Sequence, residues 1–188
     1  NDVPSETRSF DLVIVGGGIA GCAASIAASE QGMKVALIHD RPVLGGNASE
    51  EIRVHALGIT GKAKAILDSL NTRHWPNCSD RAIADNRKRQ TAFEGKENIT
   101  LFLGWRACGV KTNGSRIESV DARQIETSQL RRFCAPVFID CTGDGWIGFW
   151  SGAQYRYGRE SRNEFKENWD QYGDLWSPEK PDNRVMGS

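Results

Sequence analysis

The hydrophobic positions of this chain alternate with turn-forming residues in a pattern that predicts alternating strands and helices. An apolar run at residues 10–15 leads into the glycine-rich turn 16–18, and small residues with helical spacing follow at 22–28. A second apolar run at 34–38 completes a strand–helix–strand unit. Such a unit joins two parallel strands, so this part of the chain predicts a Rossmann-like parallel sheet.

The rest of the pattern predicts two further helices, a short strand, an antiparallel meander and a last buried strand. The meander is expected because Asn113-Gly114 favours the positive φ angles of a tight hairpin turn. The predicted elements are helices at 61–73 and 79–93, strands at 98–103, 106–112, 115–127 and 130–134, and a strand at 136–140 that a helix follows. The predicted fold class is therefore α/β, with a Rossmann-like parallel sheet, helices on its faces and a small antiparallel β-meander.

Three glycines of the first turn have the spacing of the dinucleotide-binding fingerprint. In that fingerprint Gly16 allows the tight turn, Gly18 lets a pyrophosphate approach the backbone, and Gly21 lets the helix pack against the strand. Free N–H groups at the start of the helix, together with its dipole, favour an anion at this place. The alternative is a glycine-rich turn that binds no ligand.

The end of the second predicted strand departs from the fingerprint. His39 occupies the position where an acid usually binds the ribose hydroxyls, and the acid Asp40 comes one residue later. A neutral imidazole can also bond a hydroxyl, so the ribose contact falls to His39 or Asp40. The departure leaves the type of nucleotide open.

Composition argues against several other classes of protein. Lys plus Arg and Asp plus Glu each number 24, so no net field attracts nucleic acid, and we expect the basic cluster Arg87-Lys88-Arg89 on a solvated helix face. No apolar run approaches the roughly 20 residues of a membrane span. The five cysteines include no C-x-x-C pair, which argues against a zinc site and a disulfide framework, and we expect no bound metal.

Three segments in this order resemble the flavoprotein oxidoreductases whose FAD domain has the glutathione-reductase-like fold. They are residues 15–21, residues 40–54 with the paired glycines, and residues 138–145. More narrowly, the chain resembles a bacterial family of FAD-dependent oxidoreductases with largely unassigned substrates. The resemblance implies FAD as cofactor and hydride transfer from a small-molecule substrate to the flavin. The alternative function is a non-catalytic dinucleotide-binding module or an NAD-binding Rossmann domain, which would not need the second and third segments.

The resemblance also implies which residues bind the cofactor. The first glycine turn would cradle the pyrophosphate, the paired glycines would line the path toward the flavin, Asp144 would bond the ribityl chain or the pyrophosphate, and backbone near 105–107 would hold the adenine. The expected cofactor-binding residues are Gly16, Gly17, Gly18, Ile19, Ala20, Gly21, His39, Asp40, Arg41, Gly45, Gly46, Asn47, Ser49, Ala107, Gly143 and Asp144. The three bends should then converge on one elongated ligand. An alternative role for Asp144 is the N-cap of the helix that follows it.

The catalytic chemistry is less specified. His55 follows the flavin-side loop and is the candidate general base, with a structural role as the alternative. Residues 47–51 lack the redox cysteine pair of disulfide reductases, which disfavours thiol–disulfide exchange. Aromatic residues between 146 and 176 would suit stacking on a carbohydrate-like substrate, or would form the core-facing side of a helix.

Members of the resembled families run well beyond 188 residues, so we expect a fragment. In it, residues 1–9 would be an N-terminal tail, 10–155 the FAD-binding domain, and 156–188 the start of a further segment or of a truncated substrate domain. The chain begins at Asn1, which a cleaved export signal or a deliberate shortening would explain. The first of these favours a periplasmic location.

Overall fold

The computed structural model describes residues 3–52, 54, 61, 64–71, 76 and 79–156. By its contacts the chain divides into two compact units, Asn1–Gly152 and Ala153–Ser188. Nearly all of the second unit lies outside the described residues, so the fold below is that of the first.

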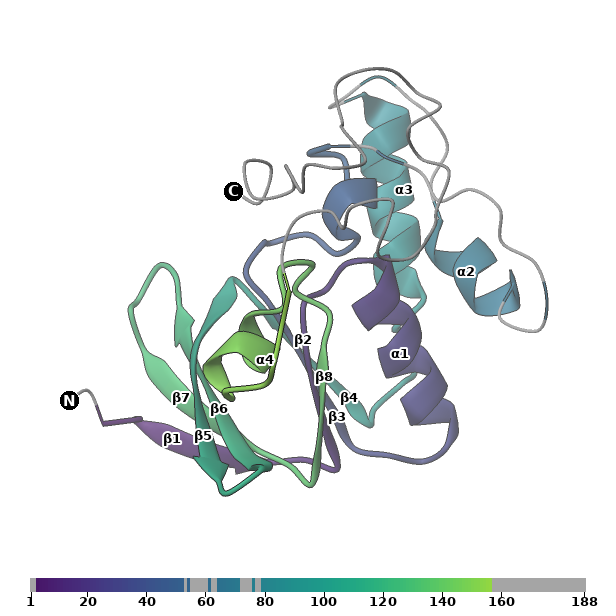
Figure 1. Ribbon diagram of the computed structural model, residues 1–188. Helices are drawn as coiled ribbons and strands as arrows, with labels where there is room; N and C mark the ends of the chain where they lie inside the picture. The colour runs from purple at the N-terminus through teal and green to yellow at the C-terminus, as the bar shows by residue number, and fades with distance from the viewer. Residues whose placement is uncertain are drawn as a thin grey trace, which may run out of the picture. The chain divides into compact units, whose positions relative to one another are not determined.

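A parallel sheet of four strands forms the centre of this unit (Figure 1). Its strands are β2 (Leu12–Val15), β3 (Val35–His39), β4 (Ile99–Leu103) and β8 (Val137–Asp140), in the order β4-β3-β2-β8. Every residue of β2 and β3 is buried. Both central strands are covered on two faces, which explains why each reads as an uninterrupted apolar run. The predicted parallel sheet is confirmed.

Helices cover one face of this sheet. They are α1 (Ile19–Glu30), α2 (Lys64–Leu70) and α3 (Asp80–Thr91), and α1 lies against β2 and β3 (Figure 1). The core on this side is formed by Leu12, Ile14, Cys22, Ile26, Val35, Leu37, Leu44, Leu70 and Phe93. Alternate residues of β2 therefore face the helices, as the period of two along a strand requires.

The second sheet contains the predicted meander, β5 (Trp105–Asn113), β6 (Arg116–Gln124) and β7 (Leu130–Cys134), with antiparallel pairing. A fourth strand, β1 (Glu6–Ser9), pairs in parallel with β7. Residues 6–9 were expected in an N-terminal tail, and that expectation is wrong for them. Their side chains alternate between half-buried and exposed, but their residue types do not alternate between apolar and polar. Only the pairing with β7 therefore identifies these residues as a strand.

A second core lies between the two sheets. The opposite face of β2, with Val13 and Val15, packs there on aromatic side chains that include Phe102, Trp105 and Phe133. The rings of Phe102 and Phe133 meet edge to face with centroids 4.7 Å apart. The short helix α4 (Trp146–Trp150) lies against β5 and β8, and its Ile147 belongs to the same core.

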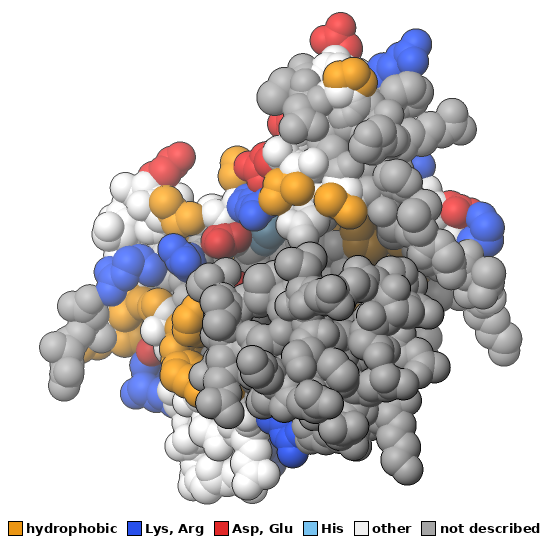
Figure 2. All heavy atoms as spheres, turned by 45° about the horizontal axis from the view of Figure 1, so that its top comes forward, with side chains coloured by type: hydrophobic (Ala, Val, Ile, Leu, Met, Phe, Trp, Pro, Cys, Tyr) orange, Lys and Arg blue, Asp and Glu red, His pale blue; other side chains and the backbone are white. Residues whose placement is uncertain are grey.

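The surface carries charges of both signs. Blue Lys and Arg side chains and red Asp and Glu side chains are interspersed on the face that Figure 2 shows, in keeping with the formal net charge of zero. Among the described residues, no helix is both long enough and apolar enough to span a bilayer.

Candidate functional site

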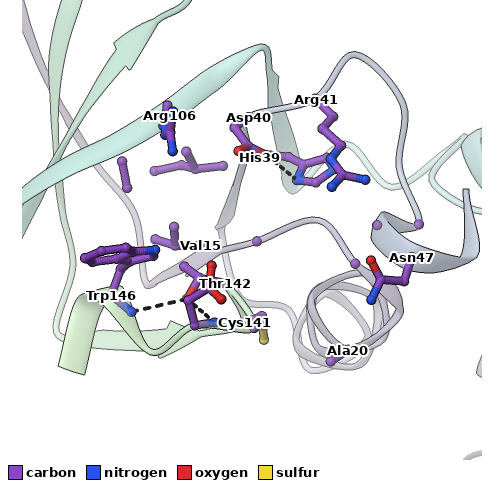
Figure 3. A pocket seen from close by; sticks show the side chains of 18 of the residues that line it. Val15, Ala20, His39, Asp40, Arg41, Asn47, Arg106, Cys141, Thr142 and Trp146 are labelled. Carbon is purple, nitrogen blue, oxygen red and sulfur yellow. Dashed lines mark hydrogen bonds and ion pairs between the residues drawn. The ribbon is translucent and has the colours of Figure 1, made fainter. Parts of the chain in front are cut away.

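A cavity of about 760 Å³ opens at the carboxyl ends of the parallel strands (Figure 3). This edge is where open α/β sheets bind their ligands, because the loops after adjacent strands separate there. Asp40 and Arg106 lie on one side of the cavity, with Thr142 and Trp146 opposite and Asn47 at one end (Figure 3). Its lining comprises Val15, Gly16, Gly18, Ile19, Ala20, Ile38, His39, Asp40, Arg41, Gly45, Gly46, Asn47, Ala48, Val54, Trp105, Arg106, Ala107, Cys108, Cys141, Thr142, Gly143, Asp144, Trp146 and Trp150.

The glycines of the first turn are required for two different reasons. A Cβ atom at Gly16 would lie 2.1 Å from the carbonyl oxygen of Cys141, and one at Gly21 would lie 1.8 Å from the carbonyl oxygen of Gly16. Packing within the protein therefore requires both. At Gly18 a Cβ atom would meet no atom of the described residues within 4 Å, its chain neighbours aside. Gly18 lines the cavity, so the absence of a side chain there leaves space for a ligand and is not required by packing within the protein.

Helix α1 starts at this turn and supplies hydrogen-bond donors to it. Gly18 is its N-cap residue, and no side chain caps the helix. The first N–H groups of an α-helix have no acceptor within the helix, so those of α1 are available at the cavity wall. Donors of this kind, aligned with the helix dipole, suit a phosphate or another anion.

The second glycine loop lies directly against the first. The Gly45 N–H donates to the Gly17 carbonyl over 2.8 Å, and a bridge pairs Gly45 with Gly18. Gly45 and Gly46 have φ angles of 115° and 55°, and a Cβ atom at Gly46 would lie 3.0 Å from the Gly18 Cα atom. The two loops can approach this closely only because neither carries side chains at the contact.

Arg89 of α3 holds this second loop from behind. Its side chain is fully buried, and its guanidinium donates to the main-chain carbonyls of Leu70 (2.9 Å), Leu44 (3.4 Å) and Ala48. Asn86 Oδ1 accepts a further bond from it. Burial lowers the pKa of Arg89. The expectation that the Arg87-Lys88-Arg89 cluster is a solvated face is therefore wrong for Arg89, since helical periodicity turns this one residue inward.

The third bend, after β8, is organised by Asp140 and Thr142. The Asp140 carboxylate accepts bonds from Thr142 Oγ1 (2.7 Å) and from the N–H groups of Ile147 (2.8 Å) and Gly148 (3.2 Å). Thr142 Oγ1 in turn accepts from the N–H groups of residues 144–146. Asp140 thus takes the role that a helix N-cap would have, and the alternative interpretation of Asp144 as the N-cap is wrong. Asp144 is instead one of the residues that line the cavity.

The structure brings most of the predicted site residues together. Gly18, Gly46 and Asp144, one from each bend, line the same cavity, as expected for three bends that converge. Three predicted residues do not line it: Gly17 packs on His39, Gly21 packs on Gly16, and Ser49 is fully buried. His55 lies outside the described residues, so its catalytic role stays a prediction.

Several lining residues were not predicted. Trp146 and Trp150 stack with ring centroids 5.4 Å apart, and both line the cavity, whereas the core interpretation placed this stretch in a helix packed inward. Ile147 alone of α4 is buried, and Trp146 is 43% exposed. The spacing of four between the two tryptophans signals a shared helix face, but the neighbour of that face is set by the fold.

Thiol chemistry finds no support here. Cys22, Cys134 and Cys141 are free thiols, and burial raises the pKa of Cys22 to about 12. Burial and the neighbouring Asp140 carboxylate also raise the pKa of Cys141 at the cavity wall. Both thiols are therefore protonated at neutral pH and poorly nucleophilic. Within the part of the chain that the structure describes, no group of His, Cys, Asp and Glu side chains is arranged to hold a metal ion.

Comparisons with known proteins agree with this geometry. A family model described as FAD dependent oxidoreductase matches residues 11–184. The soluble pyridine nucleotide transhydrogenase of Pseudomonas paraeruginosa is 25% identical over 153 residues, which cover 72% of this chain and 31% of that protein. The fumarate reductase (cytochrome) of Shewanella frigidimarina is 45% identical over 72 residues, 35% of this chain and 12% of that protein. This chain thus spans about 31% of the length of the first of these relatives.

The fold also has solved counterparts. The crystal structure of a geranylgeranyl bacteriochlorophyll reductase-like protein from Thermoplasma acidophilum superposes with a TM-score of 0.58 at 17% identity. The match covers 79% of this chain and 43% of that one. At this identity the likeness concerns the fold, and it agrees with the α/β architecture described above.

Proposed function

Because this chain belongs to the family of FAD-dependent oxidoreductases, we propose that it is the FAD-binding part of an enzyme that transfers a hydride from a small-molecule substrate to the flavin. Its relatives are about three times as long as the matched region, so the substrate-binding part of such an enzyme is expected to involve more than the cavity described here. FAD is the cofactor of the family.

The space at Gly18 carries the proposal. Gly16 and Gly21 are explained by contacts inside the protein, whereas no atom of the residues that the structure describes lies within 4 Å of the place where a Gly18 Cβ would project. A pyrophosphate needs close access to the backbone at this second glycine of the fingerprint. The hydrogen-bond donors at this wall also suit a pyrophosphate, since the start of α1 offers backbone N–H groups to an anion there. The residues present therefore fit the cofactor.

The remaining lining residues suit the other parts of an elongated dinucleotide. Gly45, Gly46 and Asn47 would line the path to the flavin ring, the Asp144 carboxylate would accept from ribityl hydroxyls, and backbone at Ala107 would hold the adenine. FAD, when bound, supplies the acceptor of the hydride. The protein's own contribution is to orient the cofactor and to leave one face of it open to substrate.

The proposal also includes a class of substrate, a carbohydrate-like molecule. This class stays a prediction from the aromatic residues after position 145, because aromatic faces pack well on sugar rings. Trp146 and Trp150 line the cavity from α4, which lies against β5 and thus at the end assigned to the adenine. The general base stays assigned to His55 as a prediction. The substrate class can be tested with the flavin-loaded protein by recording which sugars bleach its absorption.

Gly18→Ala tests the proposal directly. The φ of Gly18 is −68°, which alanine adopts without strain, and the new methyl group meets nothing within 4 Å in the described part of the chain. We expect the variant to fold as stably as the wild type but to bind FAD at least about tenfold more weakly, because the methyl group occupies the space for the pyrophosphate.

Gly109→Ala is the matched control, since its Cβ atom also meets nothing within 4 Å but Gly109 does not line the cavity. FAD binding is measured by quenching of flavin fluorescence, and a bound flavin should be bleached by dithionite. A wild-type protein that takes up NAD but not FAD would contradict the proposal. So would a Gly18→Ala variant that binds FAD as tightly as the control.

A further inference from the structure

His39 has both of its ring nitrogens engaged by the protein. Nδ1 lies 3.0 Å from the Gly17 nitrogen and accepts its N–H, while Nε2 lies 3.1 Å from the Val43 carbonyl oxygen. A carbonyl cannot donate, so Nε2 carries the proton and the ring is the neutral Nε2–H tautomer. The side chain is 6% exposed. Neither nitrogen is left to bond a ribose hydroxyl.

These two bonds connect the two glycine loops. Gly17 is the central residue of the first loop, and a Cβ atom there would lie 2.6 Å from His39 Cγ, so the His39 side chain packs directly against that backbone. Val43 precedes the paired glycines of the second loop. The direct bond from Gly45 N–H to the Gly17 carbonyl joins the same two loops beside the ring.

We propose that His39 is a positioning residue that holds the two glycine loops in the arrangement that binds the cofactor, and that Asp40 alone receives the adenosine ribose. The inference rests on the proposed function, because it takes the cavity as the FAD site. Asp40 lines the cavity, its side chain is 48% exposed, and its Oδ1 lies 3.6 Å from His39 Nδ1, beyond hydrogen-bond distance. Its carboxylate is thus directed to the cavity while the imidazole beneath it serves the loops.

The arrangement makes cofactor affinity sensitive to pH. A proton on Nδ1 would face the Gly17 N–H, so that two donors oppose each other and the loop must move. Burial lowers the pKa of His39, and Arg41 lowers it further, whereas Asp40, the Val43 carbonyl and Glu51 raise it. Burial is the largest of these effects, so the ring is neutral at neutral pH. FAD should therefore bind more weakly as the pH falls below the ordinary histidine range.

The test of His39 uses two variants of the full chain and measures the Kd of FAD by flavin fluorescence from about pH 5 to about pH 8. His39→Leu removes both bonds and should weaken FAD binding about tenfold or more at neutral pH. His39→Asn places a carboxamide oxygen near the position of Nδ1, so it keeps an acceptor for the Gly17 N–H but loses the Val43 bond, and it should restore part of the affinity. Asparagine does not titrate, so this variant should lose the decrease in affinity at acid pH that the wild type shows, up to about tenfold per pH unit.

Asp40→Asn tests the ribose contact separately. It should weaken the binding of FAD about tenfold or more at every pH, yet leave the binding of FMN, which has no adenosine, unchanged. Asp11→Asn is its matched control: Asp11 is an exposed carboxylate that accepts the Lys34 N–H over 2.7 Å, away from the cavity lining. It should leave the affinity for both flavins at the wild-type value.

A measurement on the cofactor-free protein tests the tautomer of His39 without flavin. Nitrogen NMR of the cofactor-free protein should show an imidazole signal of the Nε2–H tautomer that is present in the wild type and absent from His39→Asn. His39→Leu binding FAD like the wild type, or His39→Asn keeping the wild-type pH profile, overturns the role of His39. Equal loss of FAD and FMN in Asp40→Asn overturns the ribose assignment. A wild-type protein that binds neither flavin at any pH instead overturns the proposed function itself.

Discussion

Replacement of Arg89 by lysine should destabilise the protein although the charge is kept. The guanidinium divides its N–H groups among three main-chain carbonyls and one side-chain amide oxygen, on segments 3 to 45 residues away in the chain. A lysine ammonium is a single point donor and cannot reach acceptors spread around a planar fork. At least one or two of the buried carbonyls at Leu70, Leu44 and Ala48 would then lose their donor.

The size of the effect follows from the burial. Each buried acceptor left without a donor costs about 1–3 kcal/mol. The side chain is fully buried and a charge remains in the variant, so no relief of desolvation offsets this cost. We expect the free energy of unfolding to fall by about 2–4 kcal/mol. That is a large part of the stability of an ordinary domain.

The assay is denaturant unfolding followed by tryptophan fluorescence, with Arg87→Lys as the control. Arg87 is exposed on the same helix, so its replacement should change the unfolding free energy by less than about 0.5 kcal/mol. The affinity for FAD should also fall in Arg89→Lys, because the carbonyls of Leu44 and Ala48 flank the paired glycines. If the two lysine variants unfold at the same denaturant concentration, the assigned role of Arg89 is refuted.

Three further predictions concern other parts of the unit. Phe133→Ala, at a fully buried ring that touches three other aromatic rings, should lower the unfolding free energy by about 3–5 kcal/mol in the same assay. Asp140→Ala should cost about 1–2 kcal/mol and weaken FAD binding, whereas Thr142→Ser, which keeps the hydroxyl, should change neither; equal effects of the two would contradict the network after β8. For His39, the folded pKa lies below the unfolded value of 6.5, so its contribution to stability is complete above that pH and is lost as the pH falls through the folded pKa. Thermal unfolding of the cofactor-free protein should show this loss in the wild type and a smaller one in His39→Asn.

The spacing of residues along the chain was sufficient to predict the structure where neighbouring residues determine it. The positive φ of the turn at Gly16 and the close packing of Gly21 on Gly16 depend on positions within one strand–helix connection, and the sequence predicted both the turn and the packing. The hairpin at Asn113-Gly114 depends on the φ preferences of its own two residues. The three glycine-bearing bends could also be expected to meet, because the carboxyl ends of adjacent parallel strands lie on one edge of a sheet.

What the sequence alone could not decide is which side chains those bends direct inward. Arg87 and Arg89 have the same residue type and the same helix, yet one is exposed and the other bonds the Leu44 carbonyl 45 residues away. Strand β1 likewise exists because β7, distant in the chain, offers it a ladder edge. The tertiary structure also settled what His39 does, since its ring nitrogens meet backbone from two loops that only folding brings together. Spacing along the chain fixes local geometry, whereas the partner of a polar group depends on contacts between distant segments.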